Sequence, residues 1–122
     1  MKSCNSDPKD TKDLFNNINW NVVQIGSISS FEKTPTFKIE IEQKKIEGHA
    51  GCNSFFGTID IDGYNVKVQS LGATKMWCEN MKEERAFLDA LNKTHRFEIK
   101  KEQLFLLSDT NQVLMTLIKA TD

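Results

Sequence analysis

Apolar and polar residues alternate along most of this sequence, and the alternation is interrupted once. Between residues 36 and 42, Phe37, Ile39 and Ile41 take every second position. Side chains on a β-strand point alternately to opposite faces, so this spacing predicts a strand with one buried face. Alternation, or a run of β-branched and aromatic residues, predicts further strands at residues 20–26, 54–61, 64–68, 95–99, 103–107 and 113–118.

The interruption has the period of a helix. Between about residues 80 and 92, Phe87, Ala90 and Leu91 fall on one stripe, which predicts an amphipathic helix of about three turns. Strands on both sides of one helix are typical of α+β domains. The expected fold is a curved antiparallel β-sheet or partly open β-barrel, with the helix at about residues 80–92 covering one opening.

Two local features refine this expectation. Asp62 and Gly63 form a favoured two-residue hairpin turn between two predicted strands. The aromatic residues that we expect in the core are Trp20, Phe55, Phe87 and Phe97.

The chain has the size of one domain. It has 122 residues, 39% of them apolar, which is enough for one continuous core. Its 16 lysines and arginines nearly balance its 17 aspartates and glutamates, so we expect no nucleic-acid partner. No stretch approaches the roughly 20 apolar residues that a membrane helix needs. The domain itself is assigned to residues 17–121.

A polar segment follows the first cysteine, Cys4. Residues 5–13 contain no large apolar side chain and cannot bury enough surface to order themselves. A solvated stretch that begins at a cysteine resembles the mature end of a bacterial lipoprotein, where the thiol carries a lipid. We therefore expect residues 1–16 to form a flexible leash with Cys4 as the lipid attachment site. The alternative is an ordinary disordered terminus with an incidental cysteine.

Glycine and cysteine gather in residues 47–57. Gly48, Gly51 and Gly57 mark positions where the backbone needs positive φ or a close approach to another segment. A tight, buried loop or bulge is therefore predicted here. It contains Cys52, and the third cysteine, Cys78, lies just before the predicted helix.

These segments resemble the META domain family, also called HslJ-like. The matching motifs are, in chain order, Trp20, residues 48–57 (Gly-His-Ala-Gly-Cys-Asn-Ser-Phe-Phe-Gly), residues 74–78 (Thr-Lys-Met-Trp-Cys), Glu84 with residues 87–91, and the strands from 104 to 117. The resemblance covers about residues 17 to 120, and Trp77 departs from it because a small residue is usual there. The family is found mostly in bacterial envelope and secreted proteins, is connected with stress response, motility or virulence, and has no established enzymatic activity. The resemblance therefore implies a compartment more than a mechanism.

Cys52 and Cys78 lie in two neighbouring motifs of this pattern. In an oxidising periplasm they would pair, and closing a loop of this length stabilises a fold by about 3.5 kcal/mol. The alternative is two buried free thiols that pack as small apolar side chains.

The candidates for metal binding or catalysis are weak. His49, Cys52, Cys78 and His95 are residue types that zinc accepts, but no two of them have the spacing of ligands on one element. A cysteine nucleophile needs a base and an orienting third group, and only His49 lies near Cys52 in sequence. We expect no metal, no cofactor and no catalytic residue.

Alternation does not place all the aromatic side chains inward, and exposed aromatic residues often mark binding surfaces. The predicted partner-binding surface consists of His49, Asn53, Phe56 and Trp77. The alternative is that both faces of a curved sheet are packed, one of them under the helix.

The expected protein is a non-catalytic, lipid-anchored module of the bacterial cell envelope that faces the periplasm or the exterior. We expect a monomer that binds an envelope protein or polymer, or supports the envelope under stress, and touches the membrane only through its lipid. One alternative is an inhibitor-type domain that blocks a hydrolase with an extended loop. Another is a thiol redox protein that uses Cys52 and Cys78.

Overall fold

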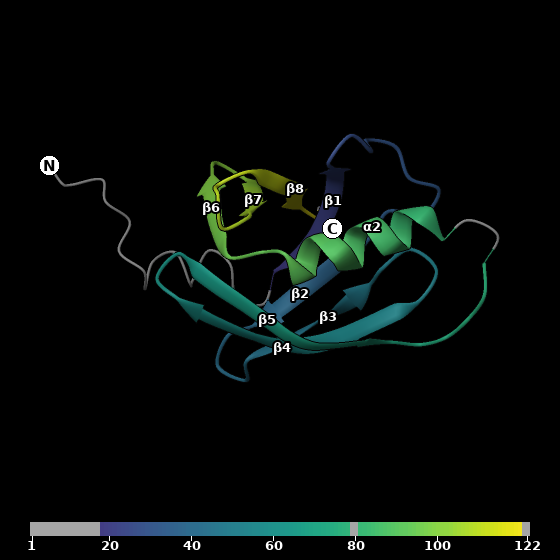
Figure 1. Cartoon of the computed structure of the whole chain (residues 1–122), viewed down its shortest axis with the longest axis horizontal. Helices are drawn as coiled ribbons and strands as arrows, with labels where there is room; N and C mark the ends of the chain where they lie inside the picture. Colours follow the sequence, from purple (N-terminus) through teal and green to yellow (C-terminus); the bar gives the residue numbers. More distant parts are fainter. Residues whose placement is uncertain (1–17, 79–80, 121–122) are drawn as a thin grey trace, which may run out of the picture.

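The computed structural model describes residues 18–78 and 81–120. In these residues it contains eight strands and one helix: β1 Asn19–Ile25, β2 Thr36–Glu40, β3 Lys45–His49, β4 Ser54–Asp62, β5 Asn65–Ala73, α2 Lys82–Asn92, β6 Arg96–Lys100, β7 Gln103–Leu107 and β8 Val113–Lys119. Each strand pairs antiparallel with the next, and β8 pairs with β1, so the sheet curves into a ring (Figure 1). The predicted α+β fold, with a curved antiparallel sheet and an amphipathic helix, is confirmed.

Two predicted regions fall partly or wholly outside the described residues. The helix that was expected at about residues 80–92 is found at Lys82–Asn92, and residues 79–80 are not described. The predicted leash at residues 1–16, including Cys4, also lies outside the described part. In the described part, no helix has both the length and the apolar character needed to cross a membrane.

The inner face of the ring is apolar and α2 packs onto it. In Figure 1, α2 lies over the half of the ring that β2–β5 form. Phe87 of α2 has its ring centroid 6.4 Å from that of Phe37 on β2 and 5.1 Å from that of Phe55 on β4. Burying a side chain of this size stabilises a fold by about 1.5–3 kcal/mol. The predicted core residues Trp20, Phe55, Phe87 and Phe97 are all buried.

The turn between β4 and β5 differs from the prediction by one residue. Asp62 still pairs with Asn65 at the end of the ladder, so Gly63 and Tyr64 form the two-residue loop. Gly63 has φ of +65°, a conformation that hairpin turns of this length require and that glycine adopts without strain.

The sequence predicted a loop or bulge in the glycine-rich segment 47–57, and the structure has a short loop and, at Gly57, a shift of the β4–β5 register. β3 extends through His49 and β4 begins at Ser54, so only residues 50–53 form a loop. Gly48 lies within β3 opposite Phe37, and a Cβ at this position would overlap the carbonyl oxygen of Thr36. The predicted close backbone approach is therefore correct at Gly48, although it occurs within a strand.

One joint of the ring is much shorter than the others. β5 and β6 share a single register pair, Asn65 with Arg96, and α2 lies between them in the chain. The other strand pairs share at least three. We call this joint the β5–β6 seam.

Candidate functional site

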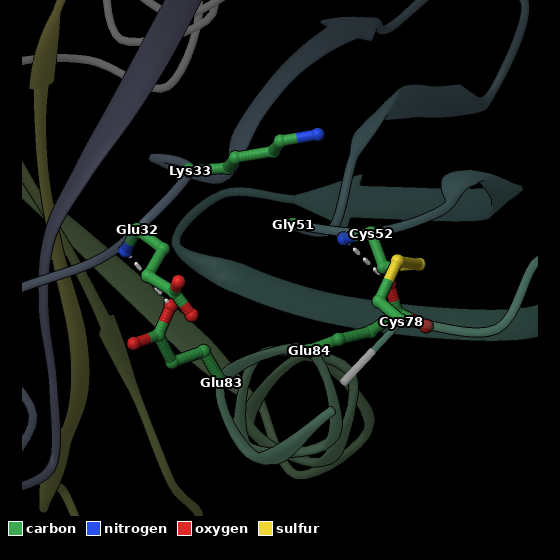
Figure 2. A pocket seen from close by; sticks show the side chains of 7 residues that line it. All are labelled: Glu32, Lys33, Gly51, Cys52, Cys78, Glu83 and Glu84. Atoms are coloured by element: carbon green, nitrogen blue, oxygen red, sulfur yellow. Dashed lines mark hydrogen bonds between the residues drawn. A yellow bond between two sulfur atoms is a disulfide. The ribbon is translucent and has the colours of Figure 1, made fainter. Parts of the chain in front are cut away.

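Three segments that are far apart in the sequence meet beside the first turn of α2. They are the loop 50–53 between β3 and β4, the segment 74–78 after β5, and Glu84 on α2. We call this meeting point the Asn53 junction. Figure 2 shows Cys52 and Cys78 bonded through sulfur, close to Glu84.

Glu84 holds the loop through buried hydrogen bonds. Its Oε1 accepts the backbone N–H groups of Cys52, at 3.0 Å, and of Asn53, at 2.7 Å. Its Oε2 accepts Nδ2 of Asn53 at 2.9 Å. Only 4% of Glu84 is exposed, and a carboxylate at that depth requires such donors to offset its desolvation. Glu84 therefore serves as the acceptor that fixes the loop to the helix.

Asn53 connects the same loop to the segment 74–78. Its Oδ1 accepts the Thr74 hydroxyl at 2.8 Å and the Met76 backbone N–H at 2.7 Å. Its Nδ2 also donates to the Met76 carbonyl oxygen at 3.2 Å. Both ends of this amide are thus bonded to the backbone or side chains of other segments, and Asn53 is 2% exposed. Asn53 is buried and does not lie on the predicted binding surface, because its side chain is committed to these internal bonds.

The loop geometry depends on Gly51. This residue has φ of +122°, which residues with a Cβ rarely adopt. The chain turns here, and Ala50 donates its N–H to the Asn53 carbonyl oxygen at 2.8 Å. This turn directs the N–H groups of Cys52 and Asn53 toward the same carboxylate oxygen.

A disulfide between Cys52 and Cys78 closes the junction, with Cα atoms 6.1 Å apart. It joins the loop to the end of the segment 74–78, and the two cysteines are 26 positions apart in the sequence. With both sulfurs bonded, neither cysteine carries a thiolate, which is the form that acts as a nucleophile or metal ligand.

The junction forms one wall of a cavity of about 160 Å³ (Figure 2). The cavity is lined by Glu32, Lys33, Gly51, Cys52, Cys78, Glu83 and Glu84. Glu83 accepts the backbone N–H of Glu32 at 3.2 Å, which ties the connection between β1 and β2 to the helix. Glu83 and Glu84 thus both accept backbone N–H groups from other segments of the chain.

The segment 74–78 carries the most exposed aromatic residue of the described chain. Trp77 is 81% exposed and Met76 is 59% exposed, although the backbone of Met76 is fixed by Asn53. Phe56, on β4, is 55% exposed and its ring lies over Gly72 of the neighbouring β5. His49 is half-buried, and its Nδ1 accepts the Gly51 N–H at 3.3 Å.

Met76 and Glu84 are the residues that the sequence-based site omitted. An acidic residue in the first turn of a helix is already explained by the helix dipole. The sequence therefore gave no reason to expect that Glu84 contacts a loop more than 30 positions away. Met76 gave no separate signal, because an exposed methionine and a buried one look alike in sequence.

The four residues considered as zinc ligands, His49, Cys52, Cys78 and His95, do not form one metal site. Cys52 and Cys78 are bonded to each other, while His95 follows α2 and its Nδ1 lies 3.0 Å from the Lys93 carbonyl oxygen. Among residues 18–78 and 81–120, no three histidine, cysteine, aspartate or glutamate side chains are grouped as a metal site would require.

Comparison with known structures finds a similar fold in proteins of low sequence identity. An NMR structure of a protein from Burkholderia xenovorans matches with a TM-score of 0.71 at 18% identity, covering 100% of this chain and 96% of that chain. A second NMR structure matches with a TM-score of 0.66 at 18% identity, covering 97% and 95%. A crystal structure of a DUF4847 family protein from Bacteroides vulgatus matches with a TM-score of 0.67 at 13% identity, covering 92% and 99%.

Comparison with curated proteins gave no match. The family model of the META domain matches residues 12–121, which include the loop 50–53, the segment 74–78 and α2. Three of the motifs that suggested this family in the sequence, residues 48–57, residues 74–78 and Glu84, meet at the Asn53 junction. The chain belongs to the META domain family.

Proposed function

We propose that this domain is a non-catalytic binding module of the bacterial cell envelope that presents Trp77 and Met76 to a partner. The observation that carries this proposal is the contrast within one short segment. The Trp77 side chain is 81% exposed, while the backbone next to it is hydrogen-bonded to the buried Asn53.

An exposed tryptophan on an anchored segment suits binding for two reasons. Its large ring supplies apolar contact area, and tryptophan is enriched among the residues that dominate interface energies. A segment already held in place loses less conformational freedom on association than a mobile loop does. The hydrogen bonds of Asn53 and the disulfide at Cys78 provide this restraint.

The internal bonding of the junction supports binding over chemistry at this site. Glu84 accepts three hydrogen bonds from the loop, and the Asn53 amide is bonded at both ends. A general acid or base must exchange protons with a substrate. The polar atoms of Glu84 and Asn53 are instead hydrogen-bonded to other parts of the chain. The partner surface is proposed to include Phe56 and His49 as well, on the strands next to the junction.

The proposed location follows from the cysteines. A disulfide between Cys52 and Cys78 persists in an oxidising compartment such as the periplasm or the cell exterior. Cys4, followed by a polar stretch, is the proposed lipid attachment site, so that the domain is a monomer tethered to the membrane by its lipid. Envelope proteins and polymers are then the accessible partners.

The test compares three forms of the protein in pull-downs from bacterial envelopes under mild crosslinking, followed by mass spectrometry. We expect wild type to retain a component that Trp77→Ala loses. Val113→Ala is the matched control, because Val113 is an exposed apolar residue on β8 and should retain that component. Equal capture by wild type and Trp77→Ala would contradict the proposal.

The lipid is tested separately. In membrane fractions, the peptide that begins at Cys4 should be heavier than its sequence by the mass of a lipid, and Cys4→Ser should abolish the increase. If the peptide with Cys4 carries no lipid in protein taken from membrane fractions, the proposed lipid attachment is wrong. The proposal for Trp77 does not depend on this result.

The same segment favours a second candidate, an inhibitor of a hydrolase. A stiff loop with exposed side chains and a disulfide at one end is suited to block an active site, and the segment 74–78 has this form. Nanomolar inhibition of an envelope hydrolase, lost in Trp77→Ala, would distinguish this candidate from a scaffold.

A further inference from the structure

The β5–β6 seam leaves part of β5 without a neighbouring strand. Two backbone hydrogen bonds flank its single register pair: Val66 N–H donates to the His95 carbonyl oxygen at 2.8 Å, and Phe97 N–H donates to the Tyr64 carbonyl oxygen at 3.1 Å. β5 continues to Ala73, and beyond Val66 its outer side has no paired strand in the described structure.

The direction of the unpaired groups follows from the strand period. Val66 directs its N–H toward β6, so Val68, two residues later, directs its N–H and C=O to the same side. The neighbours confirm this direction: the Gln69 carbonyl oxygen accepts the Thr58 hydroxyl of β4 at 3.1 Å. Ile59, opposite Val68, donates its N–H toward β3, to the Lys44 carbonyl oxygen. The Val68 backbone therefore faces away from β4, and no hydrogen bond reaches it from the described residues.

A groove of about 540 Å³ runs along this edge. Asn65–Val68 form one wall, and the opposite wall includes Asn92, Thr94, His95, Arg96 and Asp109. Lys67 and Arg96 bring two fixed positive charges to the groove, against the single negative charge of Asp109. The groove thus combines an open backbone edge with an excess of positive charge.

We propose that this groove binds an extended acidic polypeptide segment of a partner, which adds a short strand to β5 at Val68. The unpaired N–H and C=O of an edge strand are satisfied by another extended backbone, and several recognition domains bind peptides in this way. Carboxylates on the added strand complement Lys67 and Arg96. A lysine on an open edge also discourages pairing with uncharged strands, so the same side chain restricts the occupant to an acidic one.

This surface is separate from the one that we propose at Trp77, since no residue lines both. The two proposals can therefore fail independently. A segment bound here would pair with only a short stretch of β5, because Ser70 has φ of +56° and interrupts the extended edge. Binding by the isolated segment should accordingly be weak and should depend on salt.

The test uses ¹⁵N-labelled protein at low salt and the acetylated, amidated heptapeptide Glu-Thr-Glu-Val-Glu-Thr-Glu. In the free protein we expect the Val68 N–H to exchange quickly with water. At a peptide concentration ten times Kd, this exchange should slow by about tenfold, because the groove is then free about one-tenth of the time. Chemical shifts should change along residues 66–69, and a peptide with lysine in place of glutamate should cause no such change.

Two variants connect the result to the groove. Lys67→Glu should weaken peptide binding by about tenfold at low salt, the size expected for reversing one exposed charge beside carboxylates. Lys75→Glu makes the same change of charge outside the groove, on the segment 74–78, and should bind as wild type does. Trp77→Ala should also leave peptide binding unchanged.

Three results would overturn the proposal. The first is slow exchange of the Val68 N–H in the free monomer, which would show that the edge is already closed. The second is binding of the lysine peptide as tightly as the glutamate peptide. The third is protection of Val68 that rises with protein concentration together with a dimer in sedimentation, which would assign the edge to a second copy of the chain.

Discussion

The Asn53 junction and the β5–β6 seam lie in the same ring of strands and are held in opposite ways. At the junction, a disulfide and buried hydrogen bonds join three segments that are distant in sequence. At the seam, one register pair and its two flanking backbone hydrogen bonds join two strands. Closing the ring therefore does not require uniform pairing around it, because α2 packs inside and contributes the apolar contacts.

The difference has consequences for stability. Removing one member of a buried polar network leaves its partners unpaired in a medium of low polarity, which costs more than the bond itself contributes. At the seam, the side-chain bond between Arg96 and Asn111 is exposed, so water replaces a lost partner there. We therefore expect substitutions at the junction to cost several times more than substitutions at the seam.

The largest effect should come from Glu84→Ala. It leaves the buried N–H groups of Cys52 and Asn53 without an acceptor, and each such group costs about 1–3 kcal/mol. We expect the free energy of unfolding in urea to fall by about 3–5 kcal/mol. Arg85→Ala, the exposed next residue of α2, is the control and should change it by less than about 0.5 kcal/mol. Similar losses in the two variants would contradict the network described for the junction.

Removal of the disulfide should have the next largest effect. The double variant Cys52→Ala and Cys78→Ala should lose about 3.5 kcal/mol, the loop-entropy value for a separation of 26 residues. A reductant should lower the stability of wild type to that of the double variant and leave the variant unchanged. Intact mass with and without reductant should differ by two hydrogens, and free thiols in protein purified from the envelope would show that the bond does not form there.

A smaller effect is expected at the seam. The Arg96 side chain donates to Asn111 Oδ1 at 2.7 Å in an exposed position, and Arg96→Ala removes this bond beside the only register pair between β5 and β6. The loss should be about 1 kcal/mol or less in urea unfolding. A loss as large as that of Glu84→Ala would abolish the contrast between the two regions.

The smallest effect on stability is expected for Trp77→Ala. Because Trp77 is exposed, its truncation should change the free energy of unfolding by no more than about 0.5 kcal/mol, although we expect it to abolish partner binding. Fluorescence provides a second readout, since the remaining tryptophan, Trp20, is buried. A large loss of stability would mean that Trp77 packs against the domain.

The sequence predicted the ring more completely than it predicted either of the two regions. Strands such as Thr36–Glu40 show clear alternation because one face is buried. β3 was missed because Ile46 is its only fully buried residue, so its pattern is weak. The seam has no signal in the sequence, since the number of pairs between β5 and β6 is not encoded in the pattern of either strand.

The sequence indicated the motifs of the junction and one of its bonds, the disulfide between Cys52 and Cys78, but not its hydrogen bonds. Asn53 has the local properties of a turn residue, and Glu84 those of a helix start. Their hydrogen bond spans 31 positions in sequence, and local patterns do not carry such information. Asn53 was also predicted on the binding surface, which its burial contradicts.

Backbone ¹⁵N relaxation at Met76 and Trp77 tests most directly whether the junction holds this segment in place for binding. The amide order parameters of both residues should be close to about 0.85 in wild type, as for rigid backbone, and should fall in Asn53→Ala. Values below about 0.6 in the wild-type protein would show a mobile segment, and would contradict the claim that the buried amide fixes it.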